Sequence, residues 1–223
     1  METSLFIPVR SGSERVINKN TRKFSEWKGG LLQWKLENLV NSTIFDEIII
    51  STNDELSIQI ADTYRSKVPG LIIDRRPHNL CCSDTDLIDL IRYVPSITTS
   101  EYILWSHVTS PFCNLTHYAE AINKLNNHHS VLGVNLQQEY IWDPHSGKVA
   151  NACDKNFWPR TQDLKPEYLV NNAIFLAHRE KFMEGKRLGE IPFLLEFGKI
   201  SGWDIDTLDD FKIAESIYDR FFK

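Results

Sequence analysis

The residues that could do phosphate chemistry stand together near the start of this 223-residue chain. Arg10 and Lys19 flank a Ser-Gly-Ser turn (residues 11–13), which follows the apolar run 5–9. A loop of this kind after a strand offers backbone N–H groups, hydroxyls and fixed positive charge to a phosphate. It lacks the Gly-Lys-Ser/Thr of a Walker loop and the three glycines of the dinucleotide fingerprint. The loop alone fits either a phosphate cradle or a solvated surface turn.

An acidic pair near the other end of the chain could hold a metal ion. Asp204 and Asp206 alternate in an extended segment, so both carboxylates can lie on one face and bind one or two hard cations. Magnesium uses few protein carboxylates and takes further oxygens from substrate phosphates. Paired aspartates just before a helix, here with Thr207 as its expected N-cap, are also good capping chemistry. Both interpretations stay open for the pair by itself.

Three further polar positions follow a predicted strand. His107, Thr109 and Ser110 come directly after the apolar run 102–105 and are either site residues or turn residues before a proline. Arg76 could be a surface charge or a phosphate ligand. No Ser/His/Asp or Cys/His pairing suggests a covalent nucleophile, and the four cysteines lack zinc-site spacing. We expect reduced thiols, as in a cytoplasmic protein.

The elements that must position these groups alternate along the chain. Short apolar runs predict strands, and segments of helical periodicity lie between them. The expected strands are residues 5–9, 47–52, 71–73, 102–105, 131–134 and 168–175; the expected helices are 32–40, 55–65, 87–94 (capped by Ser83 or Asp84), 115–125 and a last one after Thr207. This order predicts an α/β fold, an open, mostly parallel, Rossmann-like sheet with helices on both faces. Its ligands should sit at the carboxyl ends of the strands.

Composition limits the partners. A net charge of −5 argues against general nucleic-acid binding, and no apolar run has membrane-spanning length. No signal-peptide pattern opens the sequence, which also favours the cytoplasm. We expect one domain over residues 1–223, from which the polar and aromatic segment 135–170 protrudes.

Taken in order, the motifs resemble those of the acylneuraminate cytidylyltransferases, the CMP-sialic acid synthetases, with the CMP-Kdo synthetases as more distant relatives. The opening stretch Ile-Pro-Val-Arg-Ser-Gly-Ser (residues 7–13) followed by Asn-Lys-Asn (18–20) is similar to that family's first motif. Further similar stretches are residues 45–55, 76–85, 109–112, 162–175 and 204–211. The resemblance covers nearly the whole chain, and the ordered set is more specific than any one piece.

The resemblance implies a nucleotidyltransferase that moves CMP from CTP to the anomeric hydroxyl of a nonulosonic-type sugar acid and releases pyrophosphate, using Mg²⁺. It also implies a homodimer built on segment 135–170. Asp204 and Asp206 would hold the metal, and Arg10, Lys19 and Asp206 would be catalytic. Either Asp206 or a metal-bound hydroxide would accept the hydroxyl proton. The implied nucleotide-binding residues are Arg10, Ser11, Gly12, Ser13, Lys19, Asn20, Arg76, Asp84 and Thr85. The implied sugar-binding residues are His107, Thr109, Ser110, Arg160, Gln162 and Asn171.

This chain departs from the family pattern mainly at sugar-facing positions. His107 stands where a Gln commonly contacts substrate, Thr161 replaces a frequent Arg, and Asn172 replaces Gly. Residues 28–31 also read Lys-Gly-Gly-Leu instead of the usual Gly-Lys-Pro-Leu. The acceptor could therefore be sialic, legionaminic, pseudaminic or another sugar acid. The rival functions are a nucleotide-sugar-dependent glycosyltransferase, whose Asp-x-Asp pair normally lies mid-chain, and a non-catalytic nucleotide-binding protein with the same fold.

Overall fold

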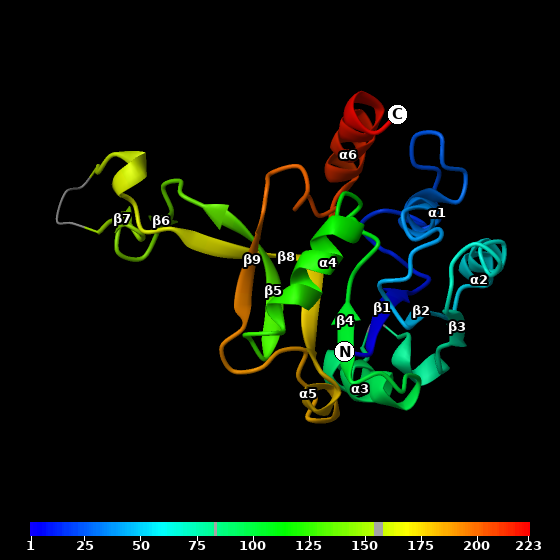
Figure 1. The fold of residues 1–223 in the computed structure, drawn as a ribbon. Coiled ribbons are helices and arrows are strands. Elements are labelled where there is room, and N and C mark those ends of the chain that lie inside the picture. The colour runs from blue at the N-terminus through cyan, green and yellow to red at the C-terminus, as the bar shows by residue number, and fades with distance from the viewer. Residues whose placement is uncertain (83, 154–157) are drawn as a thin grey trace.

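The computed structural model describes residues 1–82, 84–153 and 158–223. Its centre is a seven-stranded sheet of order β3-β2-β1-β4-β8-β5-β9 (Figure 1). The strands are β1 (Thr3–Val9), β2 (Glu47–Thr52), β3 (Leu71–Arg75), β4 (Tyr102–Trp105), β5 (Ser130–Gln137), β8 (Glu167–His178) and β9 (Phe193–Phe197). β8 runs antiparallel to β4 and β5, and the other pairings are parallel. The predicted fold class, an open and mostly parallel α/β sheet, is confirmed.

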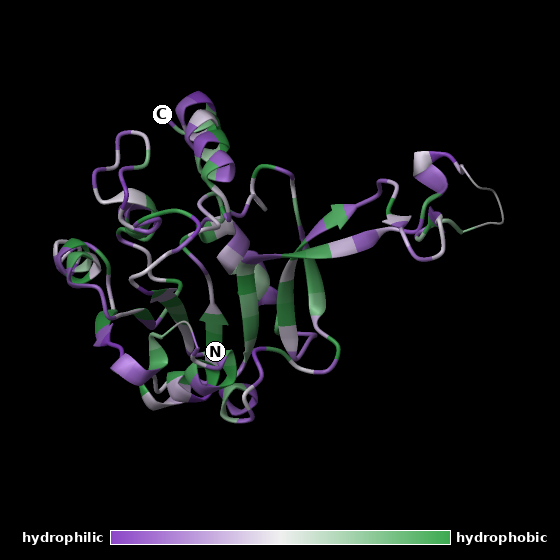
Figure 2. Ribbon diagram, turned by 180° about the vertical axis from the view of Figure 1, so that it is seen from behind, coloured by the Kyte–Doolittle hydropathy of each residue, from purple (hydrophilic) through white to green (hydrophobic). Residues whose placement is uncertain are grey.

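The central strands carry apolar runs, such as residues 5–9 and 48–50, because helices cover both faces of the sheet, as Figure 2 shows by hydropathy. One face is covered by α1 (Gly30–Glu37), α2 (Glu55–Asp62), α4 (Leu115–Lys124) and α6 (Leu208–Phe221). The other is covered by α3 (Leu87–Tyr93) and α5 (Arg179–Met183). Short 3₁₀ turns at His78–Leu80, Val94–Ser96 and Thr161–Asp163 complete the described elements.

Two local predictions differ from the structure. The cap of α3 is Asp86, whose carboxylate accepts a hydrogen bond from the Ile88 amide at 2.9 Å. The prediction placed it at Ser83, which lies outside the described residues, or Asp84. Strand β9 and the short helix α5 were not predicted. β9 lies between Pro192 and Gly198 and pairs with β5.

The N-cap of α6 follows the prediction. Thr207 and Asp210 form a reciprocal capping box, in which the Thr207 hydroxyl accepts from the Asp210 amide at 3.2 Å and Asp210 accepts from the Thr207 amide at 2.7 Å. Because Asp210 does this work, the capping alternative for Asp204 and Asp206 is not needed. Their carboxylates remain for other chemistry.

Segment 135–170 extends away from the sheet as an arm made of the ends of β5 and β8, a short hairpin of β6 (Trp142–Asp143) and β7 (Lys148–Val149), and the turn at Thr161–Asp163 (Figure 1). Apolar side chains are exposed along it. They are Leu136, Tyr140, Ile141, Trp142, Trp158, Tyr168, Leu169 and Val170.

Candidate functional site

A cavity of about 590 Å³ opens where β1 and β4 end. It is lined by residues from distant parts of the chain: Arg10, Ser13, Lys19, Asn20, Arg76, Thr85, Leu87, Leu90, Trp105, His107, Thr109, Asn172, Asp204 and Asp206 among others. The basic opening loop and the acidic pair near the C-terminus therefore meet in one pocket. This position, at the carboxyl ends of parallel strands, is the one the fold class predicts.

Lys19 and the acidic pair are joined directly. The Lys19 ammonium donates a hydrogen bond at 2.7 Å to the backbone carbonyl of Ile205, which is the residue between the two aspartates. Burial lowers the pKa of Lys19, while the charges of Asp206 and Asp204 act in the opposite direction. Arg15 forms an exposed ion pair with Asp206, 2.9 Å from Nη2 to Oδ1. Positive charges of Lys19 and Arg15 and the negative charge of Asp206 therefore lie close together at the edge of the cavity.

One carboxylate oxygen of Asp204 is available to a metal ion. Its Oδ1 is buried without a hydrogen-bond partner, while Oδ2 accepts from the Asn172 side chain at 2.7 Å. Burial raises the pKa of Asp204, and the Asn172 hydrogen bond opposes this. Among the described residues no cluster of three or more His, Cys, Asp or Glu side chains could hold a metal. Two carboxylates with an unpaired oxygen fit Mg²⁺, which binds few protein oxygens when a phosphate supplies the others.

The anion-binding side of the cavity contains a buried arginine. Arg76 is 5% exposed, and its guanidinium donates to the Ser51 hydroxyl at 3.0 Å and the Ser51 carbonyl at 2.6 Å. Burial lowers its pKa, with no carboxylate in ion-pair contact within the described residues. These two bonds use neutral acceptors, and the nearby Asp74 charge only partly offsets the effect of burial on the pKa of Arg76, so the guanidinium is suited to bind an anion in the cavity.

The turn at residues 11–13 borders a smaller adjoining pocket. Ser11, Gly12 and Asn20 line it together with Arg10 and Lys19. Gly12 has φ +75°, a left-handed conformation that favours glycine, and a Cβ there would meet nothing within 4 Å. The glycine thus serves the turn and leaves its backbone open.

His107 is a neutral group in the cavity wall. The Trp105 indole N–H donates to His107 Nε2 at 2.9 Å, which leaves the ring proton on Nδ1. Burial lowers the pKa of His107 to about 3, and the positive charges of Arg187 and Lys35 add to this shift. His107 is therefore uncharged at neutral pH.

A buried lysine stabilises the loop that carries His107 and Thr109. Lys35 of α1 is 1% exposed and donates to the Ser110 carbonyl and to the Tyr118 hydroxyl, each at 3.0 Å. On the opposite side, the Thr109 carbonyl accepts from the Ile205 amide at 2.9 Å. The loop therefore connects the α1 side of the molecule to the acidic pair.

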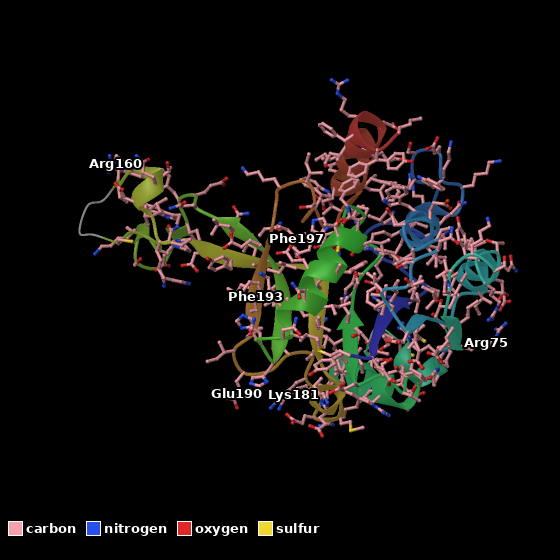
Figure 3. The ribbon with its side chains drawn as sticks, in the orientation of Figure 1. Arg75, Arg160, Lys181, Glu190, Phe193 and Phe197 are labelled. Carbon is pink, nitrogen blue, oxygen red and sulfur yellow. The ribbon has the colours of Figure 1, made fainter. Side chains whose placement is uncertain are left out.

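Several predicted residues do not line this cavity. The Ser110 side chain is buried and donates to the Asn171 carbonyl, and the Asn171 side chain donates to Asn135 Oδ1 at 3.0 Å, so both stabilise the loop and the β5–β8 junction. Arg160 lies at the far end of the arm (Figure 3), and Gln162 belongs to the 3₁₀ turn that begins directly after it. Asp84 does not line the cavity, although its neighbour Thr85 does. The sugar-binding role of Arg160 and Gln162 stays a prediction.

The structure adds residues that sequence reasoning did not assign to the site: Arg15, Trp105 and Asn172. Asn172 carried a signal, because it replaces a glycine of the family pattern. Its φ is +56°, in the region that glycine favours and asparagine tolerates, so the replacement keeps the backbone and adds a side chain toward Asp204.

Comparison with known proteins identifies the family. Residues 5–195 match the family model described as Cytidylyltransferase. The chain belongs to the cytidylyltransferase family. It is 28% identical to the N-acylneuraminate cytidylyltransferase of Escherichia coli O18:K1:H7, over 96% of this chain and 51% of that protein. It is 26% identical to the pseudaminic acid cytidylyltransferase of Campylobacter jejuni, over 98% of this chain and 97% of that protein.

The solved structures agree with the fold of this cytidylyltransferase. CMP:2-keto-3-deoxy-manno-octonic acid synthetase complexed with CTP superposes with a TM-score of 0.69 at 12% identity, covering 99% of each chain. A 4-diphosphocytidyl-2C-methyl-D-erythritol synthase from Anaerococcus prevotii gives 0.65 at 15% identity, over 98% of this chain and 96% of that one. The resemblance to CMP-sugar synthetases and the assignment as a nucleotidyltransferase are confirmed. The chain spans about half the length of the E. coli relative but nearly all of the C. jejuni one.

No helix in the described part of the chain has the length and apolar character needed to cross a bilayer.

Proposed function

We propose that this protein transfers CMP from CTP to the anomeric hydroxyl of a nonulosonic-type sugar acid and releases pyrophosphate. The observation that carries the proposal is the meeting of Lys19 with Asp204 and Asp206 in a cavity that Arg10 and Arg76 also line. The relatives named for N-acylneuraminate, pseudaminic acid and N,N'-diacetyllegionaminic acid support this class of acceptor.

The reaction is an in-line displacement at the α-phosphorus of CTP. The anomeric oxygen forms a bond to this phosphorus, the bond to the bridging oxygen breaks, and pyrophosphate leaves with the electron pair. Charge repulsion and positioning dominate the barrier, so cations around the phosphates supply most of the rate acceleration. Arg10, Lys19 and Arg76 are the cations that we assign to the phosphates, and Arg15 also lines the cavity.

Asp204 and Asp206 would hold Mg²⁺, which would neutralise charge on the phosphates and orient them. Asp206 is the more exposed of the two and is also the candidate to accept the hydroxyl proton, and Arg15 forms an ion pair with it. The neutral His107, with Nδ1–H as a donor, and Thr109 are the candidates for acceptor contacts inside the cavity.

We also propose that the protein is a homodimer that joins through the arm. Leu169 and Val170 are each at least half exposed, and Tyr168 and Trp142 lie on the same arm with similar exposure. Exposed apolar residues gathered on one segment are typical of an interface. A partner's arm could bring the predicted sugar contacts Arg160 and Gln162 to the cavity. A cytoplasmic location, where CTP is made, fits this function.

A pyrophosphate-release assay tests the proposal. The protein would be incubated with Mg²⁺, each of the four nucleoside triphosphates and a panel of N-acetylneuraminate, legionaminate, pseudaminate and Kdo. We expect release only with CTP and at least one acid. Transfer from a sugar nucleotide instead would favour the glycosyltransferase, and CTP binding without any release would favour the non-catalytic alternative.

A further inference from the structure

Arg187 is a partly buried cation that forms no ion pair with any residue in the described part of the chain. It lies between α5 and β9, where its guanidinium carbon is 3.7 Å from the ring centre of Phe175 and 5.2 Å from that of Trp105. Among the described residues, none forms a hydrogen bond or an ion pair with this guanidinium. Burial alone lowers the pKa of Arg187 to about 10.

Several other arginines of the chain have polar partners. Arg75 and Arg160 form ion pairs with Glu55 and Asp163, and Arg179 donates to a backbone carbonyl. The guanidinium of Arg187 has five N–H donors, and aromatic faces satisfy its charge but not these donors. An arginine kept in this state is suited to an anion that arrives from outside.

The neighbours of Arg187 belong to the cavity. Trp105 and His107 line it, and the Trp105 indole N–H is already used by His107. The segment that carries Arg187 packs on α3: a Cβ on Gly185 would lie 2.8 Å from Ile88 Cγ2. Leu87 and Leu90 of the same helix line the cavity. Arg187 itself is not among the residues that line the cavity. It packs against Trp105 and its positive charge helps to lower the pKa of His107, so the partly exposed guanidinium lies next to the cavity wall.

This place differs from that of the other cations. Arg10 and Lys19 lie on the opening loop, and Lys19 contacts the segment of the acidic pair. Arg187 instead neighbours His107, after the end of β4, which is the side left for the acceptor. A sugar acid always brings one carboxylate, and a guanidinium binds a carboxylate through two parallel N–H···O bonds.

We propose that Arg187 binds the carboxylate of the acceptor sugar acid, while Trp105 and Phe175 hold the guanidinium plane in place. This inference rests on the proposed function and adds the residue that recognises the acid group. It makes Arg187 a specificity residue, which selects sugar acids over neutral sugars.

The test combines a change in the protein with a change in the substrate. Arg187→Met removes the charge and keeps an apolar chain against the two rings, and Arg92→Met, which removes an exposed arginine of α3, is the control. Each variant would be assayed with the acid that the wild type uses best and with its carboxyl methyl ester. For Arg187→Met we expect KM for the acid to rise at least tenfold and KM for CTP to change less than twofold.

The wild type and Arg92→Met should prefer the acid to the ester at least tenfold, and Arg187→Met should lose this preference. An unchanged preference in Arg187→Met would overturn the proposal, and a rise in KM for CTP alone would assign the guanidinium to the phosphates. If Arg187→Met does not fold, Arg187→Lys, which keeps the charge but not the paired donors, should still weaken acid recognition.

Calorimetric binding of N-acetylneuraminate and its methyl ester distinguishes a failure of the proposed function from a failure of the role of Arg187. Binding that depends on the carboxylate and on Arg187, without turnover of any acid, would contradict the proposed function but not the role of Arg187. Turnover with equal use of the acid and the ester would support the proposed function and contradict the role of Arg187.

Discussion

The ammonium of Lys19 donates a hydrogen bond to the backbone carbonyl of Ile205, 2.7 Å away and 186 positions later in the chain. Ile205 separates the two aspartates, so this one bond sets the basic loop against the acidic pair. An ammonium and two carboxylates at this spacing can share one polyanion and its counter-ion. Because the basic loop and the acidic pair meet in space, each can be an unspecific sequence motif by itself and still form part of one site.

Replacing Lys19 with Met should therefore lower activity steeply. The change removes both the charge at the phosphates and the bond that holds the Ile205 carbonyl. We expect kcat/KM to fall about 10²–10³-fold, the range for losing one preorganised donor at a developing charge. Steady-state pyrophosphate release would measure it, with Lys28→Met, an exposed lysine outside the cavity, as the control. Equal losses in the two variants would contradict this role.

Asp206→Asn should reduce turnover far more than it reduces CTP binding. A metal held at the phosphates stabilises the transition state more than the ground state. We expect kcat to fall about 10²-fold and the dissociation constant of CTP to change only a few-fold. Turnover and calorimetric titration with CTP and Mg²⁺ would give the two numbers, and parallel losses would show that Asp206 acts in binding alone.

Asn172→Gly isolates the side chain that orients Asp204. Glycine adopts the φ of +56° at this position without strain, so only the 2.7 Å hydrogen bond to Asp204 Oδ2 is lost. We expect the affinity for a divalent cation to fall about tenfold or more, as for other residues that orient metal ligands. Mn²⁺ binding followed by electron paramagnetic resonance measures this directly. Unchanged affinity with reduced activity would mean that Asn172 contacts substrate instead.

His107→Gln should change both the sugar preference and the response of stability to acid. The folded protein keeps His107 neutral down to about pH 3, whereas the unfolded chain protonates it near pH 6.5. The unfolded state binds more protons in this window, so His107 makes stability decrease as the pH falls below 6.5. Between pH 7 and pH 5 this amounts to about 1–2 kcal/mol.

Urea unfolding at the two pH values, with wild type and His107→Gln side by side, would detect that difference. The variant should lose less stability over the same interval. A profile of sugar acids in the same preparation would show whether the preference shifts. Identical preferences would place the His107 ring away from the acceptor.

Leu169→Glu should weaken the dimer. Leu169 is 55% exposed on the arm, and a carboxylate buried between two copies would be costly. We expect the variant to be monomeric in light scattering coupled to gel filtration at concentrations where the wild type is dimeric. Ile191→Glu, at an apolar position that is 89% exposed outside the arm, is the matched control. A monomeric wild type would contradict the proposed homodimer.

Local features were readable from the sequence because local chemistry produces them. The apolar runs of β1, β2 and β4 specify buried strands, and Thr207 with Asp210 specifies the start of α6. The order of strands and helices then leads to a parallel sheet with its ligands at the carboxyl ends. The phosphate loop and the acidic pair could be named on the same grounds.

Only the tertiary structure decided which polar groups face one another. Neighbours such as Asn171 and Asn172 look alike in sequence, yet the first is buried at the β5–β8 junction and the second reaches Asp204. Arg187 stands in a segment with no motif, and only the packing of α5 and β9 brings it to Trp105. Such pairings depend on backbone direction and burial over long separations, which residue type and spacing do not encode.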